Sequence, residues 1–112
     1  MTPPVIPALS LAVLLVAQSP PAGKAQSLAD LYGQTLGAAA ECKTIAAARL
    51  VAVAEKAAER IKALTGGDEA AAAAATSLGD GIERGHRAVA SGAESCAQAA
   101  SEFANLEHEL GP

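Results

Sequence analysis

The chain has 112 residues, a formal net charge of −4 and 51% hydrophobic residues, but only 2% of its residues are aromatic. A chain of this length has no room for two domains. Its acidic balance, with a single Tyr and a single Phe, argues against nucleic-acid binding, which needs a basic face and usually stacking aromatics. Alanine, with 30 residues, supplies most of the apolar total, so large core side chains are few.

The N-terminal segment differs in composition from the rest of the chain. Five of the six prolines lie before residue 22, and residues 5–17 form an uncharged apolar run. This run is shorter than the roughly 20 residues needed to span a bilayer, and it is typical of the apolar part of a signal peptide. Gly23 and Ala25 place small residues at positions −3 and −1 of a cleavage site before Gln26.

Residues 1–25 are therefore predicted to be a cleaved signal peptide, and residues 26–112 a small α-helical hairpin domain. The absence of Lys or Arg before the apolar run leaves an uncleaved anchor and a misassigned start codon as alternatives. Export predicts a location in the bacterial periplasm or outside the cell. The mature chain would carry 7 basic and 12 acidic residues and no stable membrane span.

The first half of the mature chain shows one apolar stripe with a period of 3.6 residues, which predicts an amphipathic helix. All charged residues of this half lie off the stripe. The stripe consists of Leu28, Tyr32, Leu36, Ala39, Cys42, Ala46, Leu50, Val53, Ala57, Ile61 and Leu64.

The second half shows a similar stripe without charged residues. It consists of Ala71, Ala75, Leu78, Ile82, Gly85, Val89, Gly92, Cys96, Ala99, Phe103, Leu106 and Leu110. Between the two halves, Gly66 suits the residue after a helix end and Asp68 suits an N-cap. The sequence therefore predicts an all-α fold, an antiparallel helical hairpin. Gly79 and Gly81 could divide the second helix and give three helices.

The two cysteines support the hairpin and predict one disulfide. Pairing Cys42 with Cys96 aligns residues whose numbers sum to about 138, and most of both stripes then face each other. An even pair of cysteines in an exported chain favours a disulfide. There is no C-x-x-C motif and both cysteines lie on the stripes predicted to be buried, so we interpret the disulfide as structural and not as a redox centre.

The sequence contains no motif that predicts catalysis, a cofactor or a metal. Glu83 and His86 have the i, i+3 spacing of one half of a di-iron site. The acids that could complete such a site, Glu55 and Glu59, lie off the predicted core stripe, so a solvated charged face is the preferred interpretation. His108 likewise fits a solvated helix end. We expect a protein that is not an enzyme.

A second face of the first helix suggests protein interaction. It is made of small residues beside the core stripe, namely Ala40, Ala47, Ala48, Val51, Ala54 and Ala58. Such a face could pair with its copy in a homodimer or with an unknown envelope protein. The preferred function is a small exported helical interaction or structural module of the cell envelope. The alternatives are a periplasmic stress chaperone or sequestering protein that exposes apolar surface on demand and, less favoured, an inhibitor that uses the loop around Gly66 and Gly67.

Overall fold

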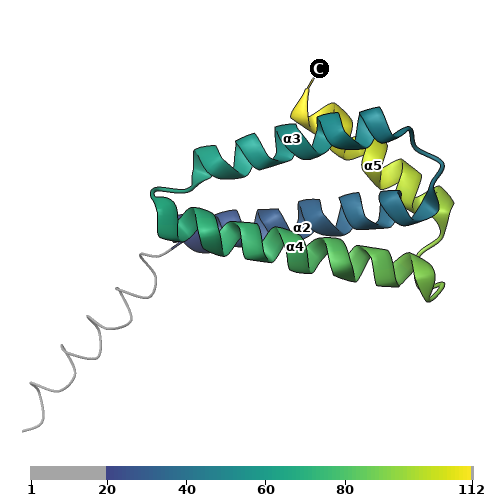
Figure 1. Ribbon diagram of the computed structural model, residues 1–112, viewed down its shortest axis with the longest axis horizontal. Helices are drawn as coiled ribbons and strands as arrows, with labels where there is room; N and C mark the ends of the chain where they lie inside the picture. Colours follow the sequence, from purple (N-terminus) through teal and green to yellow (C-terminus); the bar gives the residue numbers. More distant parts are fainter. Residues whose placement is uncertain (1–19, 112) are drawn as a thin grey trace, which may run out of the picture.

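Four α-helices make up the fold in the computed structural model, which describes residues 20–111 (Figure 1). The predicted all-α class is confirmed, but each arm of the predicted hairpin is divided in two. The helices are α2 (Pro20–Cys42), α3 (Ala47–Leu64), α4 (Asp68–Ala90) and α5 (Cys96–Leu110).

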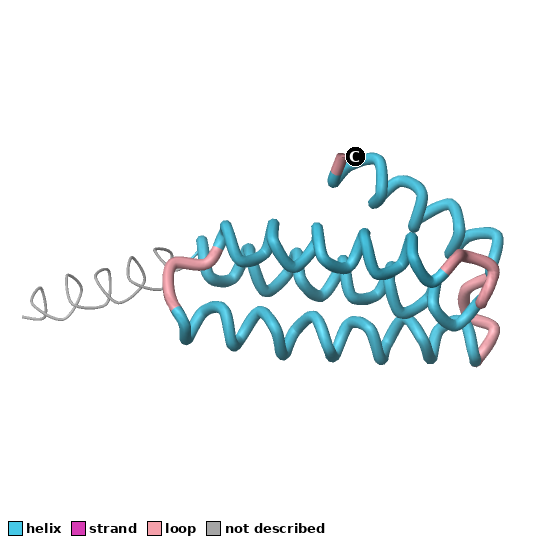
Figure 2. Tube along the Cα trace, turned by 45° about the horizontal axis from the view of Figure 1, so that its top comes forward, coloured by secondary structure: helices cyan, strands magenta, loops and turns pink. Residues whose placement is uncertain are grey.

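The first arm is divided at residues 43–46. Lys43 has φ 59°, a left-handed conformation that cannot continue a right-handed helix. The carbonyl of Ala46 then accepts the N–H groups of Arg49 at 3.0 Å and Leu50 at 3.1 Å, which begins α3. The chain reverses at this point, so α3 runs back along the direction from which α2 came (Figure 2).

The second arm is divided after α4 and not at Gly79 and Gly81, the break that the sequence left open as an alternative. Gly92 has φ +84°, and its N–H donates to the carbonyl of Val89 at 3.0 Å. This is the left-handed residue that commonly ends a helix. The hydroxyl of Ser95 accepts the N–H of Gln98 at 3.1 Å and caps α5. Helix α4 continues through both earlier glycines.

Helices α2 and α4 are parallel and pack backbone against backbone. Gly33 and Gly37 of α2 and Gly81 and Gly85 of α4 face the other helix, and a Cβ built on any of them would overlap backbone atoms. On Gly33, for example, it would lie 2.8 Å from the nitrogen of Ile82. The Gly81-x-x-x-Gly85 spacing thus serves close helix packing, which explains why the glycines do not interrupt α4.

Helix α5 runs antiparallel to α2 in the register predicted from the cysteines. The Cα atoms of Cys42 and Cys96 are 5.5 Å apart in the disulfide, which is confirmed. Further along, the hydroxyl of Tyr32 donates to Glu109 Oε2 at 3.4 Å. Burial raises the pKa of Tyr32, which keeps this hydroxyl protonated as the donor. The alignment of α2 with α5 therefore follows the one predicted from the cysteines.

The core lies where α2, α3 and α5 meet beside the start of α4. Its buried residues are Ala29, Tyr32, Leu36, Ala39, Val53, Ala57, Ile61, Ala74, Phe103 and Leu106. The stripe predicted for the second half is partly wrong, because Ala75 and Ile82 are exposed while Ala74 and Gly81 are buried. The reason is that α4 turns its glycine face to α2. None of the helices in residues 20–111 is long and apolar enough to span a membrane.

Candidate interaction groove between helices α3 and α4

The small-residue face predicted for the first helix lies mainly on α3. Residues 47, 51, 54 and 58 follow the spacing of one helix face, and we call Ala47, Val51, Ala54 and Ala58 the α3 stripe. All are exposed except Ala54, which is half-buried, and Val51 is 56% exposed. Ala40 belongs to a different helix, α2, and Ala48 is turned about 100° from Ala47, so neither continues the stripe.

Helix α4 presents a second apolar stripe, which we define as Ala71, Ala75, Leu78 and Ile82. These residues were predicted to lie in the core. In the structure Ala71 and Leu78 are half-buried, Ala75 is exposed and Ile82 is 39% exposed. The residues that periodicity assigned to a buried face thus remain partly uncovered.

A hollow of about 190 Å³ separates the two helices. We call it the α3–α4 groove, and its lining residues are Ala58, Ile61, Lys62, Ala71, Ala74, Ala75 and Leu78. Ala58 belongs to the α3 stripe, and three of the lining residues belong to the α4 stripe. Only Lys62 brings a charge to the lining, so the hollow is an apolar one. Binding sites for proteins and ligands are commonly such apolar concavities with few polar groups.

The opposite side of α3 is closed by α5. The guanidinium of Arg49 donates two hydrogen bonds to the carboxylate of Glu107, at 3.1 and 2.6 Å, and lies 5.4 Å from the centre of the Phe103 ring. Hydrogen bonding to Arg49 lowers the pKa of Glu107. Lys56 Nζ donates to the carbonyl of Gly111 at 2.7 Å. These contacts leave the side toward α4 as the open flank of α3.

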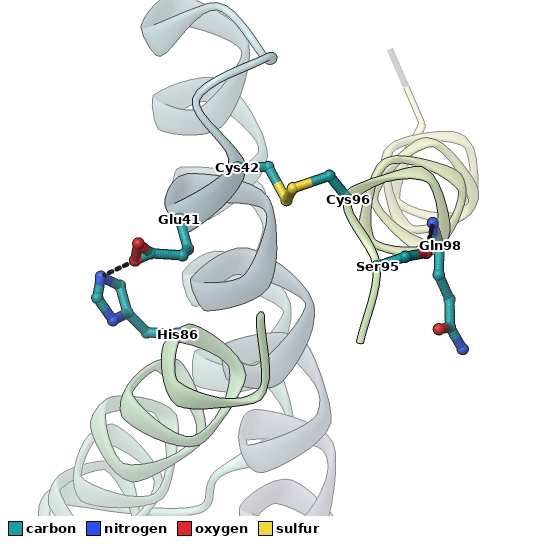
Figure 3. The surroundings of a disulfide bond; sticks show 6 residues. All are labelled: Glu41, Cys42, His86, Ser95, Cys96 and Gln98. Carbon is teal, nitrogen blue, oxygen red and sulfur yellow. Dashed lines mark hydrogen bonds and ion pairs between the residues drawn. A yellow bond between two sulfur atoms is a disulfide. The ribbon is translucent and has the colours of Figure 1, made fainter. Parts of the chain in front are cut away.

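Charged side chains of α4 hold this helix to α2. Arg84 pairs with Asp30, whose carboxylate also accepts a hydrogen bond of 2.8 Å from the side-chain amide of Gln34. His86 Nε2 lies 2.8 Å from Glu41 Oε2 (Figure 3). These contacts give polar residues of both helices a structural role.

Glu83 and His86 contact different partners. Glu83 pairs with Arg87 of its own helix at 3.6 Å, while His86 contacts α2. Glu55 and Glu59 are exposed on α3. Within residues 20–111 no group of three or more His, Cys, Asp or Glu side chains is arranged to hold a metal ion.

The disulfide is more accessible than the sequence predicted. Cys96 is exposed and Cys42 is half-buried, although both were placed on buried stripes. The reason is their position at helix ends, where α2 stops and α5 begins (Figure 3). The bond therefore joins the ends of two helices at one edge of the bundle.

The carboxylates of Glu94 and Glu102 both line a polar hollow beside α2 and α5. The hollow is lined by Leu31, Gln34, Thr35, Glu94, Glu102 and Asn105. Burial raises the pKa of Glu94, and the charge of Glu102 raises it further. At neutral pH this pair is a local electrostatic cost to the fold.

The predicted cleavage site lies at the beginning of α2. Ala25 is fully buried and Gln26 is exposed. The apolar run at residues 5–17 lies outside the described residues.

Comparison of the chain with protein-family models, with curated protein sequences and with solved structures gives no match. Of the face predicted from the sequence, only Ala58 lines the groove, and the α4 side was not predicted. The signal for the missed side was the face of Gly81 and Gly85, because a helix that turns its glycines inward must rotate the neighbouring Ile82 outward.

Proposed function

We propose that this protein is a small exported helical module that acts by binding another protein in the α3–α4 groove, without catalysis. The observation that supports the proposal most directly is the apolar lining of this groove, to which both stripes contribute and which no other helix of the described residues covers. Exposed apolar surface flanked by polar residues commonly marks a protein interaction site. The charged side chains described above support a structural role and not a catalytic one, because their contacts link one helix to another.

Export and the mature boundary are part of the proposal. The apolar run at residues 5–17 and the small residues Gly23 and Ala25 support a cleaved signal peptide and a mature chain that starts at Gln26. The disulfide between α2 and α5 fits an oxidising compartment, where such bonds persist.

Site-specific photo-crosslinking in the native cell tests the binding role. A photoreactive residue replaces Ala75, an exposed residue of the groove lining, and, in a control, Leu31 on α2, which is 58% exposed. We expect a discrete crosslinked protein from position 75 and none from position 31. Equal labelling from both positions, or none from either, would contradict a binding role for the groove.

The second candidate function is a periplasmic stress chaperone or sequestering protein. It is favoured by apolar side chains such as Val51 that are exposed without any rearrangement of the helices. A chaperone would suppress aggregation of several unrelated denatured substrates at low pH, whereas a dedicated binding module would crosslink to one partner. An aggregation assay at acid and neutral pH separates the two.

A further inference from the structure

We propose that the Cys42–Cys96 disulfide is a thiol-exchange site, which an external dithiol enters at Cys96 and which, once opened, frees α5 from the other helices. This inference goes beyond the proposed binding function and does not depend on the α3–α4 groove. It follows from the exposure of Cys96, from the places of the two cysteines in their helices and from the few other contacts that hold α5.

The disulfide is accessible to a thiol while the helices remain folded. Cys96 is exposed and Cys42 is half-buried. The bond bridges the end of α2 and the start of α5 (Figure 3). A thiolate reduces a disulfide by direct attack on one of its sulfur atoms, so buried disulfides are protected and exposed ones react. The burial of both cysteines, one of the two sequence arguments for a purely structural bond, therefore does not hold.

The places of the two cysteines decide the order of the exchange. Cys96 is the more exposed of the two, so the incoming thiolate attacks it first. Cys42 then leaves, and the exposed Lys43 follows it directly in the chain. Cys96 itself leaves in the second step. It is the first residue of α5, directly after the N-cap Ser95, and the positive end of a helix stabilises a thiolate at this position.

The exchange transfers two electrons from the dithiol to the protein. In the first step a bond forms between the attacking sulfur and Sγ of Cys96, the Cys42–Cys96 bond breaks, and Cys42 departs with the electron pair and takes a proton from solvent. In the second step the other thiolate of the reductant attacks the reductant's sulfur in this mixed disulfide, and Cys96 departs as a thiolate. The dithiol ends as a disulfide and the protein as two thiols.

Few contacts other than the disulfide hold α5. Its buried side chains are Ala99, Phe103 and Leu106. Its polar links to α2 and α3, such as the one between Arg49 and Glu107, are exposed or only partly buried, and exposed ion pairs stabilise a fold little. A helix of 15 residues is also marginal on its own. The disulfide is therefore the main tether of the N-terminal end of α5.

The packing of α2 on α4 does not involve the disulfide. These two helices meet backbone against backbone through four glycines, and α4 contains no cysteine. Opening of the disulfide should therefore be confined to the least strongly held element, as in local unfolding. Release of α5 uncovers core side chains of α2 and α3, among them Leu36 and Val53.

The rate of reduction of the full chain by dithiothreitol, followed by intact mass, tests whether exchange occurs in the folded state. Gly81→Ala raises the unfolded population, because a Cβ at this position would overlap the backbone of Asp30, about three helical turns before Cys42. We expect this variant, and urea below the unfolding transition, to change the rate less than threefold. A rate that rises at least tenfold in either case shows that reduction requires unfolding and overturns the proposal.

Trapping of the first intermediate tests the entry at Cys96. The oxidised chain is treated briefly with the monothiol glutathione, the reaction is stopped with acid, and the mixed disulfide is located by peptide mass. We expect the adduct at Cys96 at least fivefold more often than at Cys42. Equal adducts at both positions, or more at Cys42, overturn the order of exchange.

Amide hydrogen exchange before and after reduction tests the release of α5. We expect protection to fall at least tenfold in α5 and less than threefold where α2 meets α4, and reoxidation to restore it. The double variant Cys42→Ser with Cys96→Ser should match the reduced chain and should not respond to dithiothreitol. A reduced chain that keeps α5 protected, or that loses protection equally in all described helices, overturns the release of α5.

Discussion

Gly37 of α2 and Ile82 of α4 meet through their backbones. A Cβ added to Gly37 would lie 2.7 Å from the carbonyl carbon of Ile82 and 2.9 Å from its Cα, closer than any side chain can approach. Gly37→Ala would therefore push the two helices apart. Overpacking of this kind typically costs about 1–3 kcal/mol. Because backbone atoms must move, we expect the free energy of unfolding to fall by about 3 kcal/mol.

Gly79→Ala is the matched control for this prediction. Gly79 lies in α4 with nothing within 4 Å of a Cβ built on it, so the added methyl group meets no obstacle. Ala is favoured over Gly inside a helix by about 1 kcal/mol. We expect Gly79→Ala to raise and Gly37→Ala to lower the midpoint of urea denaturation. A Gly37→Ala protein as stable as the wild type would show that α2 and α4 do not pack through their glycines.

The disulfide should contribute a large part of the stability. Cys42 and Cys96 are 54 residues apart in the sequence, and the chain-entropy estimate for a loop of this length is about 4 kcal/mol. Total stabilities of small domains are about 5–15 kcal/mol. We expect a dithiol reductant, or the double variant Cys42→Ser with Cys96→Ser, to lower the melting temperature strongly. The double variant should no longer respond to reductant, and an unchanged melt of the reduced wild type would exclude the stabilising role.

The sequence predicted the α2–α5 half of the fold well because its signals were large side chains and a fixed covalent distance. Among the bulky stripe residues of α2 and α5, Tyr32, Leu36, Phe103 and Leu106 are buried in the core, and Leu28 and Leu110 pack against it. The cysteine register set their alignment. Where large side chains leave few alternative packings, helical periodicity and one disulfide suffice to predict how two helices align.

The α3–α4 half could not be predicted in the same way, because its residues are small. In a helix rich in Ala and Gly, two neighbouring faces have nearly equal hydrophobicity, and periodicity alone cannot choose between Ala74 and Ala75. The choice depends on the close approach of α2, which requires glycines on both helices. The break between α4 and α5 does have a signal in the sequence, because Gly92 suits a helix end and Ser95 suits the N-cap of the next helix. The reversal at Lys43 has no comparable signal.

Intact-mass measurement of the protein from the cell envelope tests export and oxidation together. We expect a chain that starts at Gln26 and weighs two hydrogens less than its reduced sequence. After this cleavage, Ser27 followed three residues later by Asp30 offers a new cap for α2, since a Ser with an acid at this spacing is a common helix start. A mass that includes residues 1–25 would favour the uncleaved alternative, and a gain of two hydrogens on reduction checks the disulfide.

Glu107 of α5 and Glu94, in the loop before α5, should change stability in opposite directions as the pH falls. Arg49 lowers the folded-state pKa of Glu107 by hydrogen bonding, so this group contributes stability that is present above its unfolded pKa and is lost as the pH falls through its folded pKa. We expect Glu107→Gln to be less stable than the wild type at neutral pH. Because the wild-type carboxyl becomes protonated in acid, the two proteins should converge there.

Glu94 should behave in the reverse manner. Burial, and secondarily the charge of Glu102, raise its folded-state pKa, so the native state takes up a proton more readily than the unfolded chain. Its contribution is fully present below the unfolded pKa and is lost as the pH rises through the folded pKa. We therefore expect Glu94→Gln to be more stable than the wild type at neutral pH and similar to it in acid. Melting temperatures of wild type, Glu94→Gln and Glu107→Gln between acid and neutral pH check both signs. Parallel curves for the three proteins would show that neither carboxyl has a shifted pKa in the native state.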